Sequence, residues 1–156
     1  MNLETLISPD AVLYCDHVTS KKRALEVISE LLGHETRADD PLPIFELLTE
    51  REKLGSTSLG HGVALPHART DLCDRAIGAF IKLDQGVDFD SPDNIPTDLI
   101  FALMVPEHYT DEHLKILAGL AGLFNDKHFC QTLRNASGSQ ELFKRLNTWQ
   151  ITSQAS

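Results

Sequence analysis

The chain has 156 residues, 42% of them hydrophobic, and its 14 Lys and Arg against 23 Asp and Glu give a formal net charge of −9. This length suits one globular domain whose core needs neither disulfides nor a structural metal. The acidic excess argues against a surface that binds nucleic acid or anionic lipid, since both require a cationic face.

The cysteines and the hydropathy of the chain indicate where in the cell the protein is found. The three cysteines are far apart and form no C-x-x-C pair, which indicates a reduced, cytosolic protein. The N-terminus has no basic segment before an apolar run, and the longest apolar run, Ile116–Phe124, is too short to cross a bilayer. We find no repeat and no Pro/Gly/Ser linker, and therefore expect one domain over residues 1–149 and a polar, frayed tail over residues 150–156.

The first half of the chain predicts two helices. Ser20 or Thr19 caps the first, which ends at Gly33. Its apolar positions follow helical spacing: Ala24, Leu25, Ile28, Leu31 and Leu32. The second starts near Pro41 to Pro43 and is terminated by Gly55. Its apolar positions are Ile44, Leu47, Leu48 and Leu54.

The second half predicts two strands and three helices. Residues 76–83 alternate as in a strand with one better-buried face, whereas Leu99–Val105 is apolar throughout and closed by Pro106, as in a central strand. Thr110 caps a helix through Phe124, and shorter helices follow over residues 127–134 and 139–149. Interleaved strands and helices predict an α/β fold, a single-domain sandwich with a central mixed β-sheet flanked by helices. The order of the strands is not readable from the sequence.

The segment from Arg51 to Arg69 concentrates three glycines, three hydroxyl side chains and two histidines. Glycines let backbone N–H groups turn toward one point, and hydroxyls add donors, so the segment can form an anion site. A solvated surface loop is the alternative, because the run matches neither a Walker A loop nor a dinucleotide fingerprint.

His67 follows Pro66, whose fixed φ presents the imidazole from a stiff strand end. With an ordinary pKa of about 6.5, a histidine is largely neutral near pH 7 and can attack a phosphoryl group or bind a metal. A surface histidine without function is the alternative.

Arg51 and His113 are polar residues on apolar helical stripes. Arg51 shares the stripe of Ile44 and Leu48, so its guanidinium either points inward or snorkels at the helix end. His113 begins the stripe that continues to Phe124, in the first turn of its helix. It is either a core histidine or a neutral imidazole, kept unprotonated by the helix N-terminus, that shares a pocket with His67.

Two other classes of site are not supported. The histidines lack the i, i+4 spacing of a helical zinc pair and no H-E-x-x-H motif occurs, so we expect no metal and no cofactor. A Ser/His/Asp hydrolase is also unsupported, because there is no G-x-S-x-G elbow and only Ser56 or Ser58 is available in the loop.

Three segments resemble successive signatures of one family, the enzyme IIA domains of the phosphoenolpyruvate-dependent phosphotransferase system, in their fructose/mannitol and nitrogen-regulatory branch. They are Arg51–Thr57 (REKLGST), Gly62–His67 (GVALPH), and Glu112–Leu114 (EHL) with Leu117. The resemblance extends over about residues 3–147 and implies a mixed sheet flanked by helices, as the periodicity does.

The resemblance implies that His67 accepts a phosphoryl group from a histidine phosphocarrier protein through Nε2, with Arg51 and His113 beside it. Arg51 would offset the phosphoryl charge and His113 would donate a hydrogen bond. We further infer that Ser56 and Thr57, with the loop amides, bind the phosphoryl oxygens.

Several alternatives remain within this resemblance. The absence of a fused transport module favours a stand-alone nitrogen-regulatory protein, whose phosphorylation would switch its binding to target proteins. A sugar-specific IIA that passes the group to a IIB partner, and a non-enzymatic anion-sensing module, are the alternatives. His61 and Ser58 differ from the residues common in the family. An extra imidazole at His61 would change the affinity of the site for a phosphoryl group and the pH dependence of that site. The alternative is that His61 is an exposed surface residue without a role in the site.

Overall fold

The computed structural model of the chain describes residues 3–36 and 38–155, with side chains described as far as Thr148. Residues 1, 2, 37 and 156, which include the ends of the expected domain and tail, lie outside the described residues. In chain order the elements are η1 (Leu3–Thr5), η2 (Pro9–Ala11), β1 (Val12–Cys15), α1 (Lys21–Gly33), α2 (Leu42–Lys53), β2 (Ser58–Gly60), β3 (Val63–Ala64), β4 (His67–Thr70), β5 (Ile77–Val87), β6 (Thr97–Pro106), α3 (Asp111–Phe124), α4 (Lys127–Arg134) and α5 (Ser139–Ala155).

The strands form one mixed sheet in the order β1-β5-β6-β3-β2, with β4 also paired to β6. The central strand β6 is antiparallel to β5 and parallel to both β3 and β4. Every residue of Leu99–Val105 is buried, because helices cover both faces of the sheet at this strand. The predicted mixed α/β sandwich, with an apolar central strand, is confirmed.

Strands β3 and β4 lie end to end along the same edge of β6. Val63 pairs with Leu99 in β3, and His67 pairs with Leu103 in β4. The two partners are the same number of residues apart in both pairs, so the register does not change between the two strands. The break comes at Pro66, which has no N–H to donate. Its carbonyl still accepts a hydrogen bond from Leu103 N at 2.9 Å. Residues 63–70 therefore follow β6 as one extended segment.

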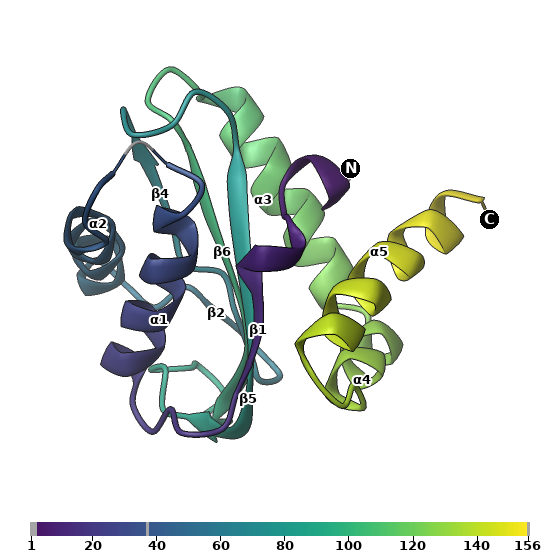
Figure 1. Cartoon of the computed structure of the whole chain (residues 1–156). Coiled ribbons are helices and arrows are strands. Elements are labelled where there is room, and N and C mark those ends of the chain that lie inside the picture. Colours follow the sequence, from purple (N-terminus) through teal and green to yellow (C-terminus); the bar gives the residue numbers. More distant parts are fainter. Residues whose placement is uncertain (1–2, 37, 156) are drawn as a thin grey trace.

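Helices cover both faces of the sheet (Figure 1): α1 and α2 lie on one face, and α3, α4 and α5 lie on the other. Four aromatic rings join β5 and β6 to α3 and α4, with neighbouring ring centroids 5.3–6.3 Å apart. They are Phe80, Phe101, Phe124 and Phe129. This packing holds the C-terminal end of α3, at Phe124, against the sheet.

The predicted helices are confirmed, with one correction near the end of α2. Ser20 caps α1 by accepting a hydrogen bond from Arg23 N at 3.1 Å. On α2 the buried face runs through Ile44, Leu48 and Glu52, each four residues apart. Leu54, predicted to belong to the apolar stripe, is 84% exposed because α2 ends at Lys53 and the chain turns away there.

The ends of other elements also differ from expectation. Strand β5 continues past the predicted residue 83 to Val87. Thr110 occupies the N-cap position of α3 without a side-chain cap bond; its own N–H instead donates to Glu112 Oε2 at 3.4 Å. Helix α5 runs to Ala155, so helical backbone continues where we predicted a frayed tail. No Gly or Pro occurs between residues 150 and 155 to stop it.

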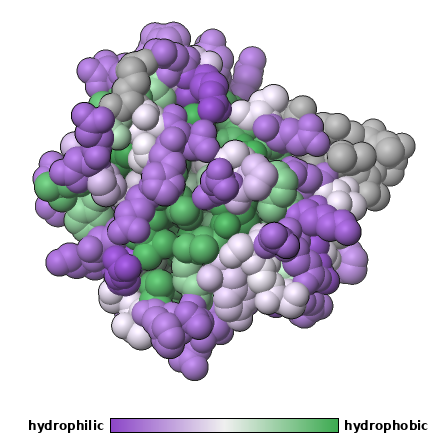
Figure 2. Space-filling model, in the orientation of Figure 1, coloured by the Kyte–Doolittle hydropathy of each residue, from purple (hydrophilic) through white to green (hydrophobic). Residues whose placement is uncertain are grey.

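The face seen in Figure 2 is mostly hydrophilic, with a hydrophobic area near its centre. Among the helices that the structure describes, none is long and apolar enough to span a bilayer.

Candidate functional site

His67 is the first residue of β4 and is half-buried. Its Nδ1 lies 2.8 Å from the carbonyl oxygen of Leu65, and a carbonyl only accepts, so Nδ1 carries the proton in this hydrogen bond. The neutral ring then has its lone pair on Nε2. Local backbone geometry thus selects one tautomer and leaves Nε2 as the unprotonated ring nitrogen.

Arg51 and His113 reach the same place from two helices. Arg51 lies in the last turn of α2, and its Nη1 donates to Gly55 O at 2.9 Å. His113 lies in the first turn of α3, and its ring centroid is 5.5 Å from that of His67, in an edge-to-face arrangement. The structure therefore brings the three residues together from α2, β4 and α3.

A cavity of about 830 Å³ opens beside these side chains. Its charged wall residues have both signs: the cations are Arg51 and Arg69, and the carboxylates are Glu50, Glu107 and Asp111. A second, smaller cavity of about 360 Å³ also contacts Arg51 and His67. His67 is accessible from this surface, which a group that reacts with another protein requires.

Burial lowers the pKa of His67 below its ordinary value, and the nearby Arg51 guanidinium lowers it further. The hydrogen bond to Leu65 and the negative charge of Glu52 act in the opposite direction without cancelling these effects. His67 is consequently neutral at pH 7, with its lone pair available for reaction.

Burial also lowers the pKa of His113, with smaller contributions from His67 and Arg69. These causes replace the helix N-terminus as the reason for a neutral imidazole. The Nε2 atom of His113 is buried and has no hydrogen-bond partner in the part of the chain that the structure describes. A buried polar atom left without a partner costs about 1–3 kcal/mol, which a bound ligand atom can recover.

The hydroxyls of Ser56 and Thr57 are engaged within the protein. Ser56 Oγ donates to Phe89 O at 2.6 Å and accepts from Ser58 N at 3.1 Å. Thr57 Oγ1 donates to the Glu52 carboxylate. Both residues line the smaller cavity, but their hydroxyls hold the loop to its surroundings. Binding of an anion by these hydroxyls would require them to leave those partners.

His61 is exposed and adopts a positive φ of 57°, in a turn between Gly60 and Gly62. Two contacts from other segments hold its backbone: its N–H donates to Asp93 Oδ2 at 2.8 Å, and its carbonyl accepts from Arg134 Nη2 at 2.8 Å. The structure therefore gives the backbone of His61 a clear role in the turn.

Two residues of this region were missed by the sequence analysis. Arg69 lines the larger cavity with His67, and the signal for it was available, since residues two apart on a strand share a face. Glu52 is buried beneath the loop, with 8% of its surface exposed. The signal for Glu52 was also available, because Glu52 lies four residues after Leu48 on the same helical face.

Comparison with known proteins places the chain in a family. Residues 5–149 match the family described as "Phosphoenolpyruvate-dependent sugar phosphotransferase system, EIIA 2", and the chain belongs to this family. The resemblance found in the sequence is thereby confirmed.

Within that family, the chain is similar to proteins named nitrogen regulatory protein. It is 41% identical over 144 residues to the one from Pseudomonas aeruginosa, covering 92% of this chain and 94% of that protein. It is 39% identical over 145 residues to the one from Escherichia coli, covering 92% and 88%. The crystal structure of the nitrogen regulatory protein IIA-Ntr from Neisseria meningitidis superimposes with a TM-score of 0.84 at 41% identity, covering 92% and 98% of the two chains.

Proposed function

We propose that this protein accepts a phosphoryl group on Nε2 of His67 from a histidine phosphocarrier protein, and that its phosphorylation state regulates target proteins in the cytoplasm. The observation that carries the proposal is the hydrogen bond from His67 Nδ1 to Leu65 O, which leaves the lone pair on Nε2 beside Arg51 and His113. Family membership and the nitrogen regulatory relatives support the same reaction.

The transfer step follows from this arrangement. The Nε2 lone pair of His67 forms the new N–P bond while the N–P bond of the donor's phosphohistidine breaks, and the donor nitrogen keeps the bonding electrons. The phosphorylated His67 ring retains its Nδ1 proton and is positively charged. The Leu65 carbonyl stabilises that charge by accepting the Nδ1–H hydrogen bond.

The two neighbouring side chains have different roles. Arg51 uses one Nη for Gly55 O, and its remaining N–H donors can bind phosphoryl oxygens in the transition state. His113 is neutral, and its buried Nε2, without a partner among the described residues, would donate to a phosphoryl oxygen. One cation and one neutral donor offset the phosphoryl charge without adding a second positive charge next to His67.

For Ser56 and Thr57 we propose a supporting role instead of direct contact with the phosphoryl group. Their hydroxyls donate to Phe89 O and to the Glu52 carboxylate, which fixes the loop between α2 and β2. Replacement of either hydroxyl would therefore act on transfer through the position of the loop.

Exposed leucines near His67 support docking of a partner protein. Leu54 and Leu114 line the larger cavity and are 84% and 66% exposed, and Leu59 lines the smaller one. A phosphocarrier that covers these side chains would exclude water from the transfer site. Phosphorylation adds negative charge at the centre of this surface, which would change its affinity for a target protein.

A sugar-specific role is the second candidate, favoured by the sugar phosphotransferase description of the family. In that role His67 would pass its phosphoryl group to a IIB partner. Incubation of the phosphorylated protein with candidate IIB proteins distinguishes the regulatory role from the sugar-specific role. Transfer of the phosphoryl group to a IIB protein at a catalytic rate would support a role in sugar transport.

The proposal is tested by intact-mass measurement after incubation with phosphoenolpyruvate, enzyme I and the phosphocarrier protein. We expect an acid-labile increase of one phosphoryl group in the wild-type protein and none in His67→Ala. Unchanged phosphorylation of His67→Ala would refute the assignment, and no uptake by the wild type from any cognate donor would favour an anion-sensing module.

A further inference from the structure

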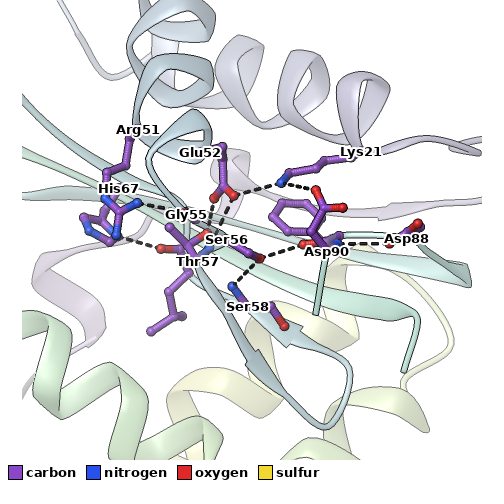
Figure 3. A network of polar contacts seen from close by, with 12 residues as sticks. Lys21, Arg51, Glu52, Gly55, Ser56, Thr57, Ser58, His67, Asp88 and Asp90 are labelled. Carbon is purple, nitrogen blue, oxygen red and sulfur yellow. Dashed lines mark hydrogen bonds and ion pairs between the residues drawn. The ribbon is translucent and has the colours of Figure 1, made fainter. Parts of the chain in front are cut away.

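A buried carboxylate lies directly behind the site. The side chain of Glu52 is 4% exposed and makes contacts on two sides (Figure 3). On one side it accepts hydrogen bonds from Thr57 N at 3.2 Å and from the Thr57 hydroxyl. On the other it forms an ion pair with Lys21 at 2.9 Å. Such a carboxylate is costly to bury, so its contacts must compensate.

A chain of hydrogen bonds leads from Glu52 to His67. The carboxylate holds the N–H and hydroxyl of Thr57, and the Thr57 carbonyl accepts from Leu65 N at 3.1 Å. The Leu65 carbonyl in turn accepts from His67 Nδ1 at 2.8 Å. The bond that selects the reactive tautomer of His67 thus depends on the position of Leu65, which Thr57 and Glu52 help to fix.

A second branch leads from the same turn to Arg51. Glu52 O accepts from Gly55 N at 3.1 Å, and the Glu52 carboxylate closes the turn by binding Thr57 beyond it. Gly55 O is the acceptor for Arg51 Nη1. The turn that Glu52 closes therefore supplies the carbonyl that orients the guanidinium, as Figure 3 shows.

Lys21 anchors the carboxylate to the rest of the protein. It comes from the first turn of α1, and its Nζ also pairs with Asp90 at 3.2 Å and lies 4.7 Å from the centroid of the Phe89 ring. Phe89 O accepts from Ser56 Oγ, so the same segment is bound to the loop a second time. Lys21 thus joins Glu52 to the segment of Phe89 and Asp90, which is distant from both in the sequence.

We propose that Glu52 is a positioning residue of this site, which fixes His67 through Thr57 and Leu65 and fixes Arg51 through the turn at Gly55. Its effect on transfer rests on the proposed function of His67, whereas its effect on the His67 ring does not.

The test uses two variants of Glu52 and one matched control. Glu52→Ala removes the acceptor for Thr57, and Glu52→Gln keeps an oxygen acceptor but removes the charge. Asp98→Asn is the control, because it weakens another partly buried ion pair, with Arg134 at 2.9 Å, away from the His67 cavities. Two properties are measured: the tautomer and pKa of His67 by ¹⁵N NMR in the protein alone, and the rate of phosphoryl uptake from the phosphocarrier protein.

We expect Glu52→Ala to lose the preference for the Nδ1–H tautomer and to slow uptake at least tenfold. Glu52→Gln should keep the tautomer and most of the rate while the pKa of His67 falls, since the Glu52 charge raises it. Asp98→Asn should leave both properties unchanged. Should Glu52→Ala fail to fold, Thr57→Val replaces it, because it removes the hydroxyl that bonds to the Glu52 carboxylate and should weaken the same tautomer preference.

The inference is overturned if Glu52→Ala, or Thr57→Val in its place, keeps the Nδ1–H tautomer of His67 and the wild-type rate of uptake, or if Asp98→Asn shifts the His67 tautomer as much. Failure of the wild type to take up a phosphoryl group would refute the proposed function instead. The NMR measurements need no donor, so they decide the role of Glu52 in that case too.

Discussion

Replacement of Arg51 should slow phosphoryl transfer with little loss of stability. In Arg51→Gln the cationic donors beside His67 are lost, and among the described residues the free protein loses the side-chain hydrogen bond to Gly55 O. A hydrogen bond to a charged group contributes about 1.5–3 kcal/mol, and about 1.4 kcal/mol corresponds to a tenfold change in rate. We therefore expect transfer to slow by about 10- to 150-fold, and the free energy of unfolding to fall by about 1 kcal/mol.

The assay is single-turnover phosphoryl transfer from the phosphorylated phosphocarrier protein, with urea unfolding measured in parallel. Arg75→Gln is the matched control, since it removes an arginine whose side chain is 60% exposed and pairs with Glu35 at 3.4 Å. Arg51→Lys keeps the charge but lacks the planar donor array, so it should recover only part of the rate. Transfer by Arg51→Gln within threefold of the wild type would refute the role given to the guanidinium.

Three further predictions concern pH and packing. Because the pKa of His67 is lower in the folded protein than the ordinary value of about 6.5, the unfolded chain binds more protons below that pH. Stability should thus rise with pH up to about 6.5 and then level off, and His67→Gln should show a weaker pH dependence in urea unfolding; an equally steep one would contradict this. Leu48→Ala, at a fully buried position, should lower the free energy of unfolding by about 2–5 kcal/mol in the same assay, and a loss below 1 kcal/mol would contradict its place in the core. Gly62→Ala should cost about 1–3 kcal/mol, because Gly62 has φ +81° and a Cβ there would lie 2.6 Å from Arg134 Nη2. Gly122→Ala, in a helix with no atom within 4 Å of the added Cβ, should instead be neutral or stabilise by up to about 1 kcal/mol, and equal effects of the two changes would refute the steric argument.

The long elements of the fold were predictable because each carries enough residues to show its period. Helix α1 and the central strand β6 follow their apolar patterns closely. Strands β1 to β4 have two to four residues each, too few for a period to show. Strands β1, β3 and β4 form because β5 and β6, from later in the sequence, supply their hydrogen-bond partners, and β2 in turn pairs with β3.

The site was predictable where a polar residue interrupts an apolar pattern, as at Arg51 and His113. The spacing of α2 also places Glu52 on the buried face, but its ion pair with Lys21 was not predictable, because no local pattern connects two residues so far apart in the sequence. The engagement of the Ser56 hydroxyl was hidden for the same reason, since its acceptor is the carbonyl of Phe89. Residue types and spacing predicted which side chains would come together, and non-local contacts determined which of their hydroxyls are already engaged within the protein.

The unbroken register of β3 and β4 along β6 makes chain length critical before His67. Successive side chains of an extended segment point to opposite faces, so deletion or insertion of one residue between Val63 and His67 would turn the imidazole toward the other face of the sheet. Pro66 cannot absorb an added or missing residue by changing its backbone conformation, because its φ is fixed. The number of residues in this segment is therefore constrained separately from the identity of its side chains.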